Sequence, residues 1–266
     1  MNSFTLGRYI PLDSLMHRFD PRAKIVAMFL LMIAIFMPSG FMGYIGIFLI
    51  ICIGIYASKL NLRFFWNAMK PMFFMLAVLL VINVFVVKSG EPVITISNFT
   101  IYWNALSQTG YIAVRLVLMI VITTLLTATT KPTDLTIALE DLMKPLKRIG
   151  FPANEIAMII SIALRFIPTL IEETQRIIKA QTSRGVDLQE GKLKEKVMAI
   201  LSLIVPLFVS SYQRAEELAN AMEARGYVPS RPRTRYRQLK MVGRDFVMLT
   251  VCMLVLLSTI GIMIWL

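Results

Sequence analysis

The stretch from residue 25 to residue 57 is almost continuously apolar, and it constrains the fold more than any other feature of the chain. As one α-helix it would be roughly 50 Å long at 1.5 Å per residue, whereas the hydrocarbon core of a bilayer is about 30 Å thick. The residues Pro38, Ser39 and Gly40 lie near its middle, and residues of these types favour a turn. The run therefore predicts two membrane spans joined by a short turn. They are expected at about 24–38 and 41–57.

The remaining long apolar segments predict three further membrane spans. They lie at 71–87, 108–130 and 244–266. The chain is 57% hydrophobic and only 17% charged, yet it carries a net charge of +12, so its charges are sparse and predominantly positive. A path with five spans leaves the segments richest in Lys and Arg on one side, and such a bias marks the cytoplasmic side. We therefore expect an all-α membrane protein with a cytoplasmic N-terminus and a C-terminus outside the cell.

Residues 131–243 differ in character from the N-terminal membrane domain, residues 1–130, because they hold most of the charges of the chain. A segment this rich in Lys and Arg is expected to stay in the cytoplasm. Apolar periodicity predicts two long helices within it, at about 155–183 and 192–224. The first half of the second helix is apolar nearly all round, but we expect this run to be too short for a span. Each helix contains a proline that is expected to kink it. These prolines are Pro168 and Pro206.

Both long helices end in a small residue, an arginine and a glycine. These residues are Ser183, Arg184 and Gly185 in the first helix, and Ala224, Arg225 and Gly226 in the second. One interpretation is structural, because glycine often ends a helix in a left-handed conformation and arginine compensates the helix dipole. The other is that each tip docks into a groove of a partner, where arginine pairs with carboxylate or carbonyl oxygens. The repeated ending, with the same Pro-x₆-Gln-Arg spacing before it, favours docking onto two similar subunits or one dimer.

Four other features have a membrane interpretation. Arg115, inside the fourth span, is expected to form a structural pair or to reach the lipid headgroups rather than to line a pathway. Asn83 in the third span is expected to form an interhelical hydrogen bond. The basic run at 231–240 is expected to contact anionic lipid and not nucleic acid. Residues 88–107 are expected to lie outside, as a small hairpin or an interfacial segment.

The sequence lacks the patterns of an enzyme. It contains no G-x-x-x-x-G-K-[ST] phosphate loop, no H-E-x-x-H and no G-x-S-x-G, and its spans hold no pair of carboxylates for an ion relay. A single histidine, His17, excludes a multi-histidine metal site, and Cys52 and Cys252 are too far apart to show a metal-binding spacing. We therefore expect no catalytic residue, no bound metal and no cofactor held by this chain.

Three stretches of the chain resemble the EcfT family, the transmembrane coupling subunits of energy-coupling factor (ECF) vitamin transporters. They are DSLMHRFDPRAK (13–24), the segment from TTKPTDL to QTSRG (129–185), and YQRAEELANAMEARGY (212–227). The resemblance extends over essentially the whole chain and is most specific between the fourth and last spans. Ser183 is a departure, because the family usually has alanine before Arg-Gly. Serine is similarly small, so the docking interpretation is kept.

The resemblance implies a non-enzymatic subunit of an ATP-driven importer in a prokaryotic cell membrane. Two ABC-type ATPase subunits, EcfA-like and EcfA′-like, would bind one at each Arg-Gly tip, and these partners would hold ATP and magnesium. A separate membrane protein, the S-component, would capture the vitamin, and the two long helices would pass the motion of the ATPases to it. The alternatives are a stand-alone secondary transporter, for which the sequence shows no polar midplane site, and a membrane scaffold coupled to no motor.

Overall fold

The computed structural model describes residues 9–37, 40–87, 89, 92–96, 99–145, 152–186, 193–228 and 239–265. These residues are almost entirely helical, which confirms the expected all-α class. They divide into two compact units. The bundle unit contains the described residues up to Ala138 and from Leu239 onward, and the crossed-helix unit contains those from Leu139 to Val228. One boundary between the two units falls within helix α6, Pro132–Met143.

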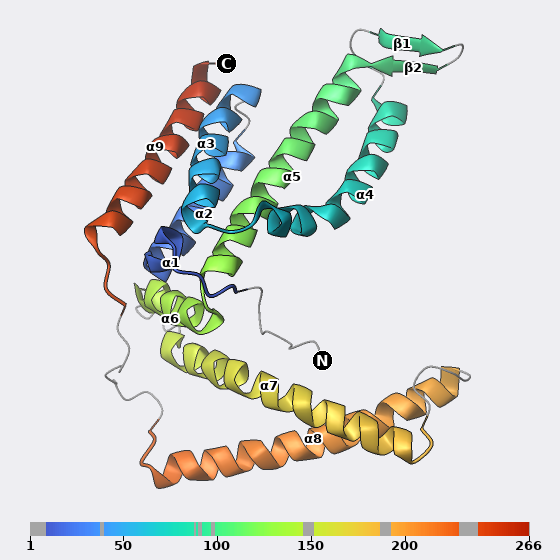
Figure 1. Cartoon of the computed structure of the whole chain (residues 1–266), viewed down its shortest axis with the longest axis vertical. Coiled ribbons are helices and arrows are strands. Elements are labelled where there is room, and N and C mark those ends of the chain that lie inside the picture. The colour runs from blue at the N-terminus through green and yellow to red at the C-terminus, as the bar shows by residue number, and fades with distance from the viewer. Residues whose placement is uncertain are drawn as a thin grey trace. The chain divides into compact units, whose positions relative to one another are not determined.

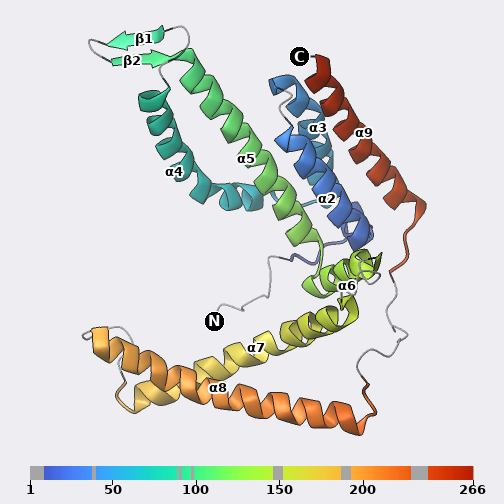
Figure 2. The same ribbon diagram turned by 180° about the vertical axis from the view of Figure 1, so that it is seen from behind.

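The bundle unit is built from helices of very different length and a short hairpin. They are α1 (Leu15–Arg18), α2 (Pro21–Phe36), α3 (Gly40–Ser58), α4 (Leu62–Val86), the strands β1 (Pro92–Ile96) and β2 (Phe99–Tyr102), α5 (Trp103–Thr129) and α9 (Gly243–Trp265). Helices α2, α3, α5 and α9 pack side by side, and α4 packs on α5 (Figure 1). Within this unit, α1 and the start of α9 lie at one end, whereas the hairpin and the end of α9 lie at the other (Figure 2).

The core of the bundle lies between α2, α3, α5 and α9, because these helices are apolar on nearly all sides. Ile35 of α2 and Ile47 of α3 are completely buried, at 0% exposure. Gly54 of α3 allows a close approach, since a Cβ there would lie 3.0 Å from the Cε of Met16 and 3.1 Å from a methyl carbon of Leu125. Helix α2 begins sharply because the Asp20 carboxylate accepts the backbone N–H of Arg22 and Pro21 occupies the first helical position.

Among the described residues, five helices are long and apolar enough to cross a membrane, judged by length and composition. They are α3, α4, α5, α8 and α9. Helix α2, expected as a span at 24–38, has only 16 residues, which is about 24 Å of helix at 1.5 Å per residue. Helix α8 is long and apolar enough for a span over residues Lys194–Ala224. By these two measures, the expectation that its apolar run is too short to cross a membrane is wrong. The mean hydropathy of α8 is nevertheless 1.5, below the 2.1 to 2.6 of the other four helices.

Two predicted spans begin earlier than expected. Helix α4 starts at Leu62, where the Asn61 side chain accepts the Arg63 N–H at 3.0 Å, and Pro71 lies inside it. The sequence-based start at Pro71 was wrong because a proline removes one backbone hydrogen bond without ending a long apolar helix. Helix α5 starts at Trp103, not at residue 108, because strand β2 leads directly into it.

The loop between α4 and α5 contains an antiparallel hairpin, one of the two forms expected for residues 88–107. Its strands β1 and β2 pair from Pro92 with Tyr102 to Ile96 with Phe99.

Asn83 of α4 donates to the Thr109 hydroxyl of α5 at 3.0 Å, which confirms the predicted interhelical hydrogen bond. The turn residues at 38–39 and the basic residues at 231–238 lie outside the described residues.

Candidate functional site

The first predicted tip lies at the end of α7 and has a complete backbone cap. Arg184 is the C-cap residue, and Gly185 follows it with a φ of +85°, in the left-handed region that glycine adopts without strain. The N–H of Gly185 donates to the carbonyl of Thr182 at 3.0 Å, and the N–H of Val186 donates to the carbonyl of Gln181 at 3.0 Å. These two bonds form a Schellman motif, which satisfies carbonyls that a helix end leaves unpaired.

The second predicted tip, at the end of α8, has the same backbone geometry. Gly226 has a φ of +72°, and its N–H donates to the carbonyl of Glu223 at 2.8 Å. The N–H of Tyr227 donates to the carbonyl of Met222 at 3.0 Å, and Arg225 is again the residue between the helix and its glycine. The structural interpretation is therefore confirmed for both glycines, because each ends its helix in a left-handed conformation. Docking by the arginines stays a prediction.

The tip residues are all exposed to solvent. They are Ser183, Arg184, Gly185, Ala224, Arg225 and Gly226. A Cβ built on Gly185 or Gly226 would meet no atom within 4 Å, so these glycines serve backbone conformation and not close packing within the chain. Within the described part of the chain, neither Arg184 nor Arg225 forms an ion pair. Each tip therefore combines a fixed backbone with a positive charge that has no internal partner there.

Changing Gly185 to alanine is expected to loosen the last turn of α7. A residue with a Cβ loses about 1 kcal/mol in the left-handed region, which is about a fivefold change in a local opening equilibrium. Hydrogen exchange at the Val186 amide should accelerate by that factor, and Gly185→Asn should accelerate it less. The control is Gly110→Ala in α5, where a Cβ also meets nothing within 4 Å but φ is not positive. Unchanged exchange at Val186 in Gly185→Ala would contradict the cap.

The crossed-helix unit holds the two tips apart. Helices α7 (Ala153–Ser183) and α8 (Leu193–Ala224) pack against each other and run in opposite directions, so their C-terminal tips lie at opposite ends of the pair (Figures 1 and 2). Arg214 of α8 lies at the contact. Its Nη2 is 3.6 Å from Oε2 of Glu173, and its guanidinium carbon is 5.9 Å from the ring centre of Phe166. These contacts help to fix where the two helices cross.

The two arginines of the Pro-x₆-Gln-Arg repeat have different surroundings in the structure. Arg214 is packed at the crossing, whereas Arg176, its counterpart in the Pro-x₆-Gln-Arg repeat, is exposed on α7. A groove of about 230 Å³ lies along the contact, lined by Ile162, Phe166, Leu170, Ser211, Ala215 and Ala219 among others. Pro168 and Pro206 both lie inside continuous helices, as expected, and the kink at each stays a prediction.

Comparison with known proteins finds relatives along almost the whole chain. The profile of the CbiQ family, described as cobalt transport protein, matches residues 13–236. Several curated relatives are named energy-coupling factor transporter transmembrane protein EcfT. The protein from Macrococcus caseolyticus is 45% identical over 90% of both chains, that from Bacillus subtilis 42% over 92% of both, and that from Listeria innocua 39% over 100% of this chain and 99% of its own. The chain belongs to the EcfT family. Membership confirms the resemblance, and with the apolar helices it makes this a multi-pass membrane protein.

Arg115 of this EcfT-family protein forms a structural cluster. Its Nε donates to the Tyr44 hydroxyl at 3.3 Å, and its guanidinium lies 5.0 Å from the ring centre of Tyr111 and 5.6 Å from that of Phe36. The Tyr44 hydroxyl in turn donates to the carbonyl of Ile35 near the end of α2. A cation beside a helix C-terminus is favourable, so Arg115 supports the end of α2. The structural-pair interpretation is confirmed.

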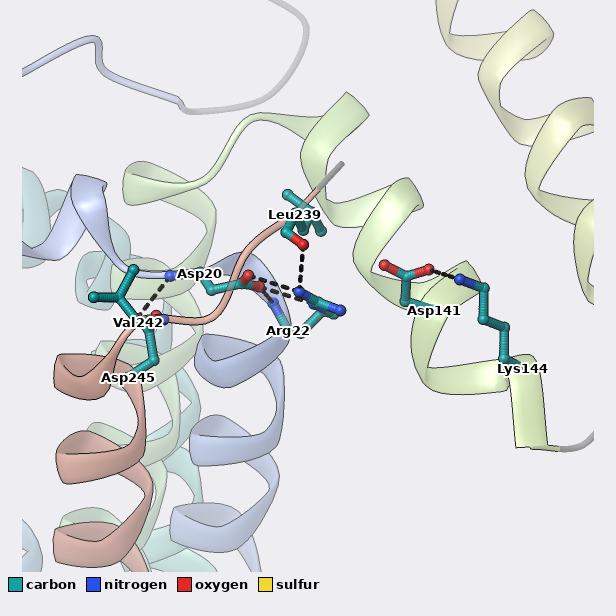
Figure 3. A network of polar contacts seen from close by, with 7 residues as sticks. All are labelled: Asp20, Arg22, Asp141, Lys144, Leu239, Val242 and Asp245. Carbon is teal, nitrogen blue, oxygen red and sulfur yellow. Dashed lines mark hydrogen bonds and ion pairs between the residues drawn. The ribbon is translucent and has the colours of Figure 1, made fainter. Parts of the chain in front are cut away.

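Sequence reasoning missed a polar network in this EcfT-family protein, which we call the Asp20–Asp245 network. It joins Asp20, Arg22, Leu239, Val242 and Asp245 (Figure 3). Asp20 is 6% exposed and Asp245 is 1% exposed. The only local signal is an aspartate at the start of each of two apolar helices, which does not show that the two meet. Among the described residues, no group of three or more His, Cys, Asp or Glu side chains could hold a metal ion.

Proposed function

We propose that this protein is the coupling subunit of an ECF-type importer for a vitamin or another micronutrient. In this proposal two cytosolic ABC-type ATPase subunits bind the Arg184 and Arg225 tips, and an S-component in the membrane binds the substrate. The chain itself catalyses no reaction, because ATP and magnesium are held by the ATPases. The names of its relatives, which identify the transmembrane protein of an energy-coupling factor transporter, support this assignment.

The observation that carries the proposal is the pair of equivalent tips. Both place an exposed arginine between the last helical residue and a left-handed glycine, with the same two capping hydrogen bonds. Arginine is favoured in grooves that offer carboxylates or carbonyls, because its planar fork makes several hydrogen bonds at once. Two such tips at opposite ends of one helix pair suit a partner that presents the same groove twice, as a dimer of related ATPase subunits does.

Transmission of work requires that the tips bind the open and closed ATPase dimers with different free energy. A partner that binds both states equally shifts no equilibrium, however tightly it binds. The antiparallel α7–α8 pair offers a physical route, because a change in the separation of its two ends must alter the crossing near Arg214 and Glu173. We place the crossed-helix unit and the N-terminus in the cytoplasm and the C-terminus outside, in a prokaryotic cell membrane, on the charge bias of the sequence.

A tagged copy purified from its native membrane tests the proposal. We expect two ABC-type ATPases and a small apolar membrane protein to co-purify, and the reconstituted complex to take up substrate only with hydrolysable ATP. The chain alone, in sealed vesicles, should move none of the micronutrients that the complex takes up. Uptake by the chain alone would instead support a secondary transporter. Co-purification without any effect of the chain on ATP turnover would support a scaffold.

A further inference from the structure

Residues 239–242, which lead into α9 and which we call the returning segment, are bonded to the start of α2 (Figure 3). Nη2 of Arg22 donates to the Leu239 carbonyl at 2.8 Å and to Oδ2 of Asp20 at 3.0 Å. Oδ1 of Asp20 also accepts the backbone N–H of Arg22 at 2.9 Å, so the carboxylate is held from two sides. Arg22 therefore links the backbone of the returning segment to the cap of α2.

Asp245 completes the connection between the two helix starts. Its Oδ1 accepts the Asp20 N–H at 3.0 Å, and its Oδ2 accepts the Val242 N–H at 2.8 Å. The second bond is half of a capping box, in which an acidic residue in the first turn satisfies the N–H before the helix. Each aspartate lies at the positive end of a helix dipole, which stabilises its charge. One buried carboxylate therefore orients α9 directly against α2.

Two properties indicate that this connection does not open easily. Both aspartates are buried, and removing one partner of a buried, hydrogen-bonded charge is strongly destabilising. A further bond on the exposed side, from Nη2 of Arg244 to the Arg18 carbonyl at 2.6 Å, holds the same segment. In addition, the bundle unit resumes at Leu239, the residue that Arg22 binds.

We propose that the Asp20–Asp245 network is a fixed anchor, at which motion of the crossed-helix unit stops before it reaches α9. Arg22 and Asp245 are then positioning residues for coupling, because they hold α9 against α2 while the tips move. This inference rests on the proposed function only for the source of the motion. It gives the returning segment a definite role, since an unanchored segment would let tip motion displace α9 instead of acting on the membrane partner.

Spin-label distances in the complex with its co-purifying ATPases test the anchor. The labels are placed at Lys240→Cys and Arg63→Cys, both exposed positions of the bundle unit, in a chain carrying Cys52→Ser and Cys252→Ala. A second pair, at Lys179→Cys and Glu223→Cys, reports the separation of the tips. In the chain that carries only the labels and the cysteine replacements, we expect the distance between the labels at positions 240 and 63 to differ by less than about 2 Å between ADP and a non-hydrolysable ATP analogue. The Arg22→Ala variant should make that distance depend on nucleotide, and Arg22→Lys should have an intermediate effect.

The matched control is Arg18→Ala, which removes an exposed positive charge four residues away and leaves the network intact. It should behave as the unchanged chain does. A nucleotide-dependent shift of the first distance in the unchanged chain would overturn the anchor. So would an Arg22→Ala variant whose distribution broadens equally with both nucleotides, because that result shows a purely structural role. Absence of ATPases from the preparation would instead count against the proposed function, so the two failures are distinguishable.

Discussion

The double charge reversal Arg184→Glu with Arg225→Glu is expected to abolish co-purification of ATPase subunits. Arginine at the centre of an interface commonly contributes at least about 2 kcal/mol, which corresponds to about a 30-fold loss of affinity per tip. Losing both tips should weaken the assembly by about 10³-fold, since two tips on one chain bind one dimer with avidity. Co-purification followed by quantitative binding of the isolated ATPases to detergent-solubilised protein measures the effect.

The control for this experiment is a charge reversal of the same size elsewhere on α7. Arg176→Glu with Lys179→Glu changes the net charge equally at two exposed positions but leaves both caps untouched. This variant should retain the ATPases almost fully, because exposed charges away from an interface contribute little. Each single tip variant should retain an intermediate amount. If the double tip variant keeps its ATPases and still supports uptake, the arginines do not dock and the proposed function loses its main support.

The sequence predicted the two glycine caps correctly because a helix C-cap is a local structure. A left-handed glycine and the two hydrogen bonds that accompany it depend on the last few residues of one helix, so the pattern Arg-Gly was sufficient to place them. Four of the five expected spans, those of α3, α4, α5 and α9, correspond to helices long and apolar enough to cross a membrane, since length and hydrophobicity are properties of a single segment. Asn83 was interpreted correctly because a polar side chain inside a span has few alternatives to a neighbouring helix.

The failures arise where a boundary or a partner depends on more than one local signal. Pro71 was taken as a helix start, although the capping signal is at Asn61. Helix α8 is apolar enough to count as a possible span, although it is less apolar than the other four helices, and the sequence-based expectation did not allow for this. The Asp20–Asp245 contact joins residues 225 positions apart, and no periodicity reports such a pair. Arg214 and Arg176 look equivalent in sequence but differ in their contacts, because only one helix face meets the other helix.

Changing Asp245 to alanine is expected to destabilise the bundle unit by about 2–4 kcal/mol, because each buried donor that loses its acceptor costs about 1–3 kcal/mol. The loss has two identifiable parts, because the buried N–H of Asp20 and the partly buried N–H of Val242 would both lose their acceptor. Asp245→Asn keeps one acceptor oxygen and should lose roughly half as much. Equilibrium unfolding in mixed micelles with increasing SDS measures the change in the free energy of unfolding.

Asp13→Ala serves as the control for that measurement, since Asp13 is an exposed aspartate of the same unit and its replacement should change stability by less than about 0.5 kcal/mol. Equal stability of Asp245→Ala and Asp13→Ala would mean that water replaces the carboxylate without loss, and that the helix starts are held by apolar packing alone. A large loss confined to Asp245 would show that the two helix starts are joined through this carboxylate. That property would allow α2 and α9 to remain together while the crossed pair of helices, which precedes α9 in the chain, changes its geometry.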